Sequence, residues 1–259
     1  MYEILRNEQL KNNTYMLEIH APLISKSIKP GEFVIIMVDN MSERIPMAVY
    51  DINGENIIIL YNVLGYSTNE LKNTKSIFSV VGPLGNESML TKEIDNYKDK
   101  KIGFIVSGTG IASINRIKKE LDKENITSEI LCVGESLVEG IKTITEEEID
   151  STIKEFDVIY TVGSYEFMEK VVDKAKDMNK EIKVSLSPLM LDGIGLCGAC
   201  RVLINGEIKF ACIDGPEFDG LSVDFDSAKK RMNLFKTEEG RRYLQATEGD
   251  TFKAKVGED

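Results

Sequence analysis

Hydrophobic and polar positions alternate over short stretches from residue 1 to about residue 95, a pattern that predicts β-strands. The N-terminal stretch MYEILRNEQLKNNTYMLEI alternates in this way, and residues 34–38 form a short apolar run after Pro30-Gly31. Asn53-Gly54 separates the runs AVYDI and ENIIILYNV, which is a strong hairpin signal. Short strands joined by glycine and proline turns predict a small β-barrel over residues 1–97.

The pattern changes near residue 100, where apolar runs begin to alternate with helical stretches. The predicted strands are IGFIV (102–106), EILCV (129–133), VIYTV (158–162) and EIKVSLS (181–187). The helix after the first strand has Ile114, Ile117 and Leu121 on one face. TEEEIDSTIKEF is expected to form the second helix, and Phe167, Val171, Ala175 and Met178 are expected to line one side of the third. Repeated strand–helix units predict a parallel sheet with helices on both faces, over residues 98–187.

Residues 188–225 have a different character and predict a third, smaller module. They are rich in glycine and cysteine, and Asn205-Gly206 between VLI and EIKF is a second hairpin signal. Residues 226–259 are expected to form a charged helix followed by a loose polar end.

Composition and charge narrow the class of protein. A length of 259 residues suits two domains and a small appendage. A formal net charge of −11 makes the chain a poor candidate for nucleic-acid or anionic-membrane binding. No apolar run approaches the roughly 20 residues that span a bilayer, and the N-terminus lacks a signal-peptide core. We therefore expect a cytoplasmic protein.

Cysteine spacing gives the sharpest chemical signal, because three of the four cysteines lie close together in the pattern Asp192-x4-Cys197-x2-Cys200-x11-Cys212. Clustered cysteines in a protein expected in the cytoplasm favour metal or redox chemistry over disulfides. An iron–sulfur cluster needs four ligands, normally thiolates, and Asp192 stands where a fourth ligand is expected. A structural zinc ion held by the same residues is the alternative. Cys132 lies within a predicted strand and is expected to be a core residue.

Three loops of the α/β region carry a possible nucleotide site. Ser107-Gly108-Thr109-Gly110 joins a strand to a helix, where glycines let a pyrophosphate approach backbone N–H groups. The alternative is a tight turn without a ligand. Glu135 follows the second strand, where a carboxylate can bind a ribose 2′-OH and repel a 2′-phosphate, so we expect NAD(H) rather than NADP(H). Gly163 follows the third strand.

Two segments of the barrel could hold phosphate. Arg44-Ile45-Pro46-Met47-Ala48 precedes one strand, and the second segment runs from Tyr61-Asn62-Val63 to Gly65-Tyr66-Ser67-Thr68. Arg44 could pair with one phosphate, and Ser67, Thr68 and neighbouring amides could hold the rest of a pyrophosphate. Without further context, both segments are ordinary surface turns.

Together these segments resemble the ferredoxin–NADP reductase-like electron-transfer subunits, over nearly the whole chain. The most specific part is SLSPLMLDGIGLCGACRVLINGEIKFACIDGPEFDG. It closely resembles the small subunits of the electron-bifurcating NADH-dependent reduced ferredoxin:NADP oxidoreductases, also called the β subunits of sulfide dehydrogenase. Electron-transfer subunits of dihydroorotate dehydrogenase B are wider relatives. The first cluster position is usually cysteine in that wider family and aspartate in the bifurcating type, so Asp192 favours the latter.

The resemblance implies a β-barrel that binds FAD, an α/β parallel-sheet domain that binds NAD(H), and a small C-terminal [2Fe–2S] module. Arg44, Pro46, Met47 and Ala48 match the flavin motif, while Val63, Gly65, Ser67 and Thr68, with Asn62 beside them, match the phosphate segment. Gly108 and Gly110, with Thr109 between them, match the dinucleotide loop. Asp192, Cys197, Cys200 and Cys212 match the cluster ligands. No catalytic acid or base is implied, in keeping with a single histidine.

The resemblance also implies an oxidoreductase that moves electrons between NAD(H), FAD, the cluster and a larger flavin and iron–sulfur partner subunit. We expect it to be active only in that heterodimer, and to reach ferredoxin through the complex. Departures from the family pattern lie at Ala48, in SGTGIASI, at Gly134-Glu135-Ser136 and at Gly163-Ser164. Two alternatives stay open: the electron-transfer subunit of a dihydroorotate dehydrogenase, and a non-catalytic docking subunit with zinc and a degenerate nucleotide site.

Overall fold

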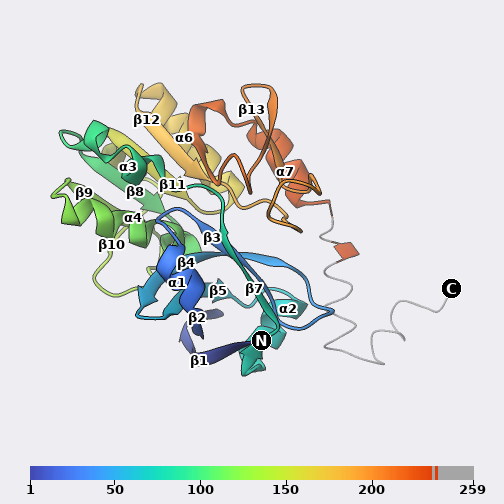
Figure 1. Cartoon of the computed structure of the whole chain (residues 1–259). Helices are drawn as coiled ribbons and strands as arrows, with labels where there is room; N and C mark the ends of the chain where they lie inside the picture. Colours follow the sequence, from blue (N-terminus) through green and yellow to red (C-terminus); the bar gives the residue numbers. More distant parts are fainter. Residues whose placement is uncertain (235–236, 239–259) are drawn as a thin grey trace.

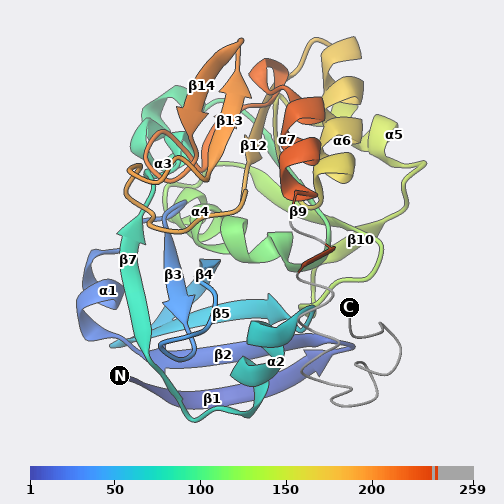
Figure 2. The ribbon, with the colours of Figure 1, turned by 90° about the vertical axis from the view of Figure 1, so that its right-hand side faces the viewer.

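The computed structural model describes residues 1–234 and 237–238. Two lobes are stacked one on the other, with the N-terminal barrel below and the α/β domain above, as Figure 1 shows. The C-terminal module lies on the α/β lobe, beside its last helices (Figure 2). No helix among the described residues is long and apolar enough to cross a membrane.

The N-terminal lobe is a nearly closed antiparallel barrel. Its strand order is β6-β1-β2-β5-β4-β3-β7. The edge strands β6 and β7 follow one another in the chain, so the sheet curls until its edges come close. The strands are β1 (Tyr2–Lys11), β2 (Thr14–His20), β3 (Phe33–Met37), β4 (Ile45–Asn53), β5 (Asn56–Asn62), β6 (Ser76–Ile77) and β7 (Ser79–Leu84). Helices α1 (Pro22–Ser27) and α2 (Tyr66–Asn73) interrupt them. The predicted barrel is confirmed, including the hairpin at Asn53-Gly54.

The upper lobe is built on a six-stranded sheet of order β10-β9-β8-β11-β12-β15. It is parallel except for β15, which pairs antiparallel with β12. The strands are β8 (Ile102–Val106), β9 (Ser128–Val133), β10 (Lys142–Ile144), β11 (Val158–Val162), β12 (Glu181–Ser185) and β15 (Glu217–Asp219). Short helices α3 (Met89–Lys92) and η1 (Ile94–Tyr97) lead into it from the barrel.

Helices cover both faces of this sheet, as the alternating pattern predicts. Helix α4 (Ile111–Lys123) packs on one face through the predicted row Ile114, Ile117 and Leu121. Helices α5 (Ile149–Lys154) and α6 (Tyr165–Asp177) pack on the other face. Cys132 is buried in β9, so its expected core role is confirmed.

Helix α5 is shorter than the stretch TEEEIDSTIKEF suggests. The carboxylate of Glu148 accepts a hydrogen bond from Thr145 N at 2.7 Å and closes a turn before the helix begins. The acidic residues at its start therefore form a turn rather than a first helical turn.

The C-terminal module contains the predicted hairpin, β13 (Arg201–Ile204) and β14 (Glu207–Phe210). Asn205 and Gly206 between them have φ of 52° and 78°, the positive values that a two-residue hairpin turn requires. The chain then adds β15 to the main sheet, forms the turn η3 (Gly220–Ser222) and enters the predicted charged helix, α7 (Phe225–Met232). Most of the predicted polar end lies outside the described residues.

Candidate functional site

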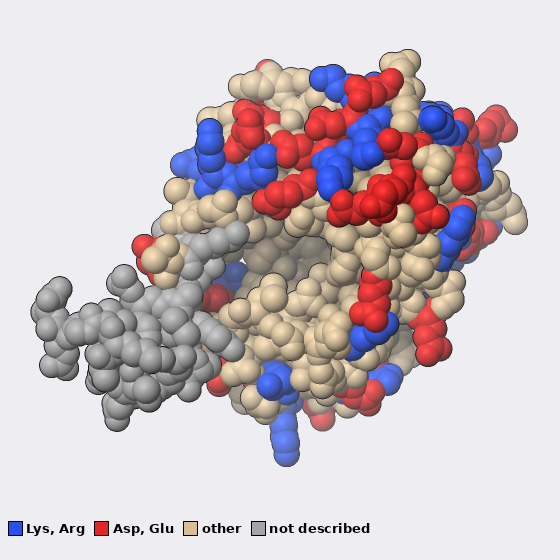
Figure 3. All heavy atoms as spheres, turned by 180° about the vertical axis from the view of Figure 1, so that it is seen from behind, with Lys and Arg blue, Asp and Glu red and all other residues tan. Residues whose placement is uncertain are grey.

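A cavity at the junction of the two lobes is lined by several of the predicted flavin-site residues. Figure 3, which views the face opposite to Figure 1, shows that the surface between the lobes is hollowed. The barrel residues Met47, Asn62, Gly65, Ser67 and Thr68 line this junction cavity together with Thr109 of the α/β loop. Residues far apart in sequence thus surround one space. Arg44 is exposed just before β4, and Val63 packs on the barrel core.

A second cavity adjoins the first, because Met47 lines both. Its wall includes Pro46 and Ala48 of β4, Ser113 of α4, the end of β12 at Ser185–Ser187, and Met190. This second cavity, which we call the ring cavity, therefore touches the barrel, the α/β domain and the start of the cysteine module. The hydroxyls of Ser113, Ser185 and Ser187 were missed by sequence reasoning, since nothing near them in sequence marks them as site residues.

Polar side chains organise the barrel side of the junction cavity. Ser67 is buried, and its hydroxyl donates to Glu43 Oε2 at 3.0 Å. Thr68 Oγ1 accepts from Leu64 N at 3.0 Å and from Gly65 N at 3.1 Å, and so forms the start of α2. Glu43 also lines the cavity and was not predicted. The Glu43 carboxylate would repel an anionic ligand in this cavity. The only sequence feature that could have pointed to Glu43 is its place next to Arg44.

The glycine loop lies at the carboxyl ends of two neighbouring parallel strands, β8 and β11. A Cβ at Gly110 would meet Val162 O at 2.5 Å, and a Cβ at Gly163 would meet Ser107 Oγ at 2.3 Å. Close packing between these strand ends thus accounts for both glycines. Gly108 differs, because it has φ of +53° and open space where a Cβ would point. Among the three, Gly108 is the one that leaves room for a ligand beside the backbone.

Glu135 lies apart from the glycine loop, at the end of β9, and lines a third cavity with Gly134, Ser136 and Tyr50. Its carboxylate is ion-paired with Lys11 and accepts a hydrogen bond from Asn12 Nδ2 at 3.2 Å. The hydrogen bond to Lys11 is the main cause that lowers the pKa of Glu135. The predicted sugar-binding carboxylate therefore already bonds the β1–β2 end of the barrel, a contact that sequence patterns did not reveal.

The cysteine loop brings the predicted metal ligands together in two pairs. Cys200 and Cys212 are buried with their Sγ atoms 3.2 Å apart, while Cys197 is exposed. Asp192 accepts from Cys197 N at 2.5 Å through Oδ2 and from Ile194 N at 2.9 Å through Oδ1. Three glycines with positive φ, namely Gly193, Gly195 and Gly198, curve the backbone around them.

The protonation of these groups follows from their surroundings. The backbone N–H of Ile194 is the largest cause that lowers the pKa of Asp192, so this carboxyl is an anion at neutral pH. Burial, together with Cys200, raises the pKa of Cys212 to about 12. The Cys212 thiol therefore needs a bound cation to become thiolate near neutral pH.

The paired arrangement fits a two-iron cluster. In a [2Fe–2S] cluster each iron takes two protein ligands, and bridging sulfides complete its coordination. A zinc ion instead needs four protein ligands around one point. Within the described part of the chain, no three His, Cys, Asp or Glu side chains are arranged to hold one metal ion. Three thiols and one carboxylate supply the four protein ligands that a [2Fe–2S] cluster needs.

Both this module and the whole chain are similar to known proteins. Residues 187–224 match the family described as the iron–sulfur cluster binding domain of dihydroorotate dehydrogenase B. A Thermotoga maritima protein, named as a homolog of the dihydroorotate dehydrogenase B (NAD(+)) electron transfer subunit, is 36% identical over 93% of this chain and 94% of its own length. The Clostridium perfringens electron transfer subunit of that enzyme is 26% identical over 86% of this chain and 97% of its own length.

Two solved structures extend the comparison. A chain of the NADH-dependent reduced ferredoxin–NADP oxidoreductase, a structure described for flavin-based electron bifurcation, has 30% identity and a TM-score of 0.78. The match covers 94% of the present chain and 98% of the other. Phthalate dioxygenase reductase shares the fold alone, with 13% identity, a TM-score of 0.52 and coverage of 68% and 65%.

Proposed function

This chain belongs to the family of dihydroorotate dehydrogenase B electron-transfer subunits, and from that premise we propose that it moves electrons between NAD(H), FAD, a [2Fe–2S] cluster and a larger partner subunit. The observation that carries the proposal is the place of Met190, which lines the ring cavity and stands two residues before Asp192 in the cysteine loop. A flavin held in that cavity would lie next to the cluster module.

The barrel and α/β residues are assigned to FAD as follows. Pro46, Met47 and Ala48 form the wall against which the flavin ring packs, and the exposed Arg44, next in the chain to Glu43 of the junction cavity, pairs with the pyrophosphate. Asn62, Val63, Gly65, Ser67 and Thr68 shape the segment that carries the phosphates, opposite Thr109. When bound, FAD exchanges a hydride with NAD(H) and single electrons with an iron–sulfur cluster. No residue of the chain needs to act as an acid or base.

The nucleotide is assigned to the carboxyl end of the parallel sheet. Gly108 offers open backbone for the pyrophosphate, Gly110 and Gly163 keep the two strand ends close, and Glu135 faces the ribose. Binding of the ribose by Glu135 has to replace its contact with Lys11. A carboxylate at this position favours NAD(H) over NADP(H), because it repels a 2′-phosphate.

The cluster is assigned to Asp192, Cys197, Cys200 and Cys212. Cys200 and Cys212 form the buried pair, and the half-buried Asp192 forms the second pair with the exposed Cys197. An exposed edge suits electron exchange with another protein. We infer that the chain works in a heterodimer with a larger flavin and iron–sulfur subunit, through which it reaches ferredoxin. Asp192 favours the NADH-dependent ferredoxin:NADP oxidoreductase type of complex over a dihydroorotate dehydrogenase.

The cofactor content of the purified chain tests this assignment. After anaerobic preparation we expect about one FAD and about two irons per chain, with a brown-yellow absorption spectrum. A colourless protein that contains zinc and no iron would support the docking subunit instead. Co-purification from the native organism tests the partner, and a chain that shows full activity alone would contradict the heterodimer.

A further inference from the structure

Two arginine side chains hold the short loop between Cys197 and Cys200. Arg201 Nη1 donates to the carbonyl of Gly198 at 3.2 Å, and Arg231 Nη2 donates to the carbonyl of Ala199 at 2.9 Å. Gly198 and Ala199 are the only residues between these cysteines. Both intervening carbonyls are thus bonded to guanidinium groups, while the N–H of Ala199 donates to Cys197 Sγ at 3.4 Å.

Arg231 belongs to α7, which lies beyond the matched cluster module of residues 187–224. Figure 2 shows α7 alongside α6, next to the β13 strand. The side of α7 that carries Phe225 and Ala228 is buried. Lys229 of α7 also forms an ion pair with α6, with its Nζ 2.6 Å from Glu169 Oε2. The helix is therefore fixed on the α/β lobe, and this packing sets the position of Arg231.

Arg231 also has one side-chain donor that no group in the described part of the chain accepts. Its Nε is buried, and it has no hydrogen-bond partner among the described residues. Burial lowers the pKa of the Arg231 guanidinium, Arg201 lowers it further, and Cys200 raises it. Two guanidinium groups bonded to successive carbonyls of the cysteine loop, one of them with a buried unpaired N–H, are complementary to an anion at that loop.

We propose that Arg201 and Arg231 are positioning residues for the iron–sulfur cluster, and that their charges raise its reduction potential. The inference rests on the proposed function, because it requires a cluster bound at the cysteine loop. The two guanidinium groups hold the carbonyls of Gly198 and Ala199 away from the anionic cluster and leave the Ala199 N–H directed at sulfur. Reduction adds one negative charge, so nearby cations stabilise the reduced cluster more than the oxidised one.

The test is a redox titration of the full-length chain, followed by electron paramagnetic resonance of the reduced cluster. Arg231→Gln removes the charge but keeps an amide donor, Arg231→Lys keeps the charge, and Arg201→Gln tests the second guanidinium. Lys230→Gln is the matched control, since it removes one charge from an exposed position next in sequence on α7. Iron content is measured for every variant.

We expect Arg231→Gln to lower the midpoint potential, so that the ratio of reduced to oxidised cluster at a fixed potential falls by about threefold or more. Arg231→Lys should lie closer to wild type, and Lys230→Gln should match wild type. An unchanged midpoint in Arg231→Gln at full iron content overturns the inference.

If Arg231→Gln does not retain iron, the midpoint potential of Arg201→Gln is the test instead. We expect that potential to be lower than in wild type, and an unchanged potential overturns the inference. A wild-type chain without iron would instead overturn the proposed function. The two failures are therefore distinguishable.

Discussion

At the scale of single residues, Asp192 best illustrates what a motif can and cannot reveal. Its spacing marks it as a ligand candidate, but only the structure reveals that its carboxylate accepts the N–H groups of Ile194 and Cys197. These bonds orient the side chain within the cysteine loop. They also describe a turn-capping aspartate, so the ligand role needs its own experiment.

Replacing Asp192 tests that role directly. We expect Asp192→Ala to lose iron or to change the electron paramagnetic resonance signal of the reduced cluster. Asp192→Cys should keep a cluster with an altered signal, because sulfur binds iron more covalently than oxygen does. Asp214→Ala is the control, since Asp214 accepts from Phe210 N at 2.6 Å in the same module. Full iron content and an unaltered signal in Asp192→Ala would show that the ligand assignment is wrong.

Glu43 is a residue that no motif indicated, and it bears on how tightly FAD is held. Its carboxylate lies in the junction cavity and accepts a hydrogen bond from Ser67. We expect Glu43→Gln to bind FAD about fivefold more tightly, since a repulsion of about 1 kcal/mol with the pyrophosphate is removed. Equilibrium titration of FAD into the flavin-free chain measures this, with Glu55→Gln at an exposed barrel turn as control. Equal or weaker binding by Glu43→Gln would place the pyrophosphate elsewhere.

At the scale of elements, long periodic segments could be predicted from the sequence, whereas short edge strands could not. Strands β8 and β11 coincide with the predicted runs IGFIV and VIYTV. Strand β15 has three residues, and its pairing with β12 depends on partners more than 30 residues away in the chain. No local periodicity marks such a strand. The same reason hid the contact between Glu135 and Lys11, which joins two domains.

The close approach of β8 and β11 explains one glycine of the nucleotide loop in purely steric terms. A Cβ at Gly110 would lie 2.5 Å from Val162 O, so the backbone must move to accept it. We expect Gly110→Ala to lower the free energy of unfolding by about 1–3 kcal/mol. Gly65→Ala is the control, because that position has open space and an ordinary φ of −141°. Equal unfolding midpoints in denaturant for the two variants would contradict this account.

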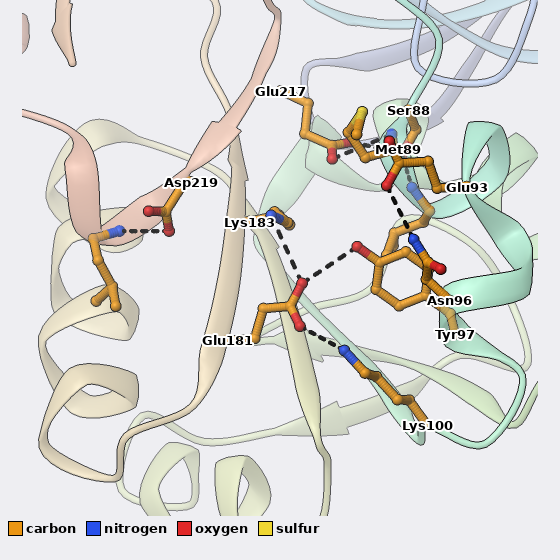
Figure 4. Close-up of polar contacts among 12 residues, drawn as sticks. Ser88, Met89, Glu93, Asn96, Tyr97, Lys100, Glu181, Lys183, Glu217 and Asp219 are labelled. Carbon is orange, nitrogen blue, oxygen red and sulfur yellow. Dashed lines mark hydrogen bonds and ion pairs between the residues drawn. The ribbon is translucent and has the colours of Figure 1, made fainter. Parts of the chain in front are cut away.

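At the scale of the whole molecule, polar contacts drawn in Figure 4 join the sheet to the segment that leaves the barrel, around Glu217 and around the half-buried Glu181. Glu217 of β15 accepts from Ser88 Oγ at 2.5 Å and from Met89 N at 3.3 Å, both in the segment that leaves the barrel. Glu181 of β12 lies nearby, with Lys100 Nζ at 2.8 Å and Tyr97 Oη at 3.3 Å. Each of the two carboxylates ties the sheet to the linking segment.

The two carboxylates should affect stability with opposite signs as pH changes. Burial raises the pKa of Glu217, although Ser88, Lys183 and Tyr160 act against that shift. Folding then favours the protonated form of Glu217. Its contribution to the free energy of unfolding therefore decreases as pH rises from the unfolded pKa of about 4.3 towards the folded pKa. For Glu181, burial acts upward but Lys100 and Lys183 outweigh it and leave its pKa lowered. Its contribution is present above about pH 4.3 and is lost on acidification.

Thermal unfolding between pH 3 and 8 measures both effects, because the Glu181 contribution changes only below about pH 4.3. We expect Glu217→Gln to gain stability relative to wild type as pH rises, by up to about 1.4 kcal/mol for each unit by which the folded pKa is raised. Glu181→Gln should be less stable than wild type above about pH 4.3, and the difference should shrink on further acidification. A difference between Glu217→Gln and wild type that does not change with pH would show that the Glu217 carboxyl has an ordinary pKa.

The central claim is that one chain passes electrons from a nicotinamide nucleotide to its own iron–sulfur cluster. The direct measurement adds NADH anaerobically to the purified holoprotein and follows flavin absorbance together with the electron paramagnetic resonance signal of the reduced cluster. We predict that NADH bleaches the flavin and produces the cluster signal, and that NADPH does so less effectively. Two results would contradict the account. One is a flavin that NADH leaves oxidised, and the other is a flavin that NADH bleaches in a protein that gives no cluster signal even after chemical reduction.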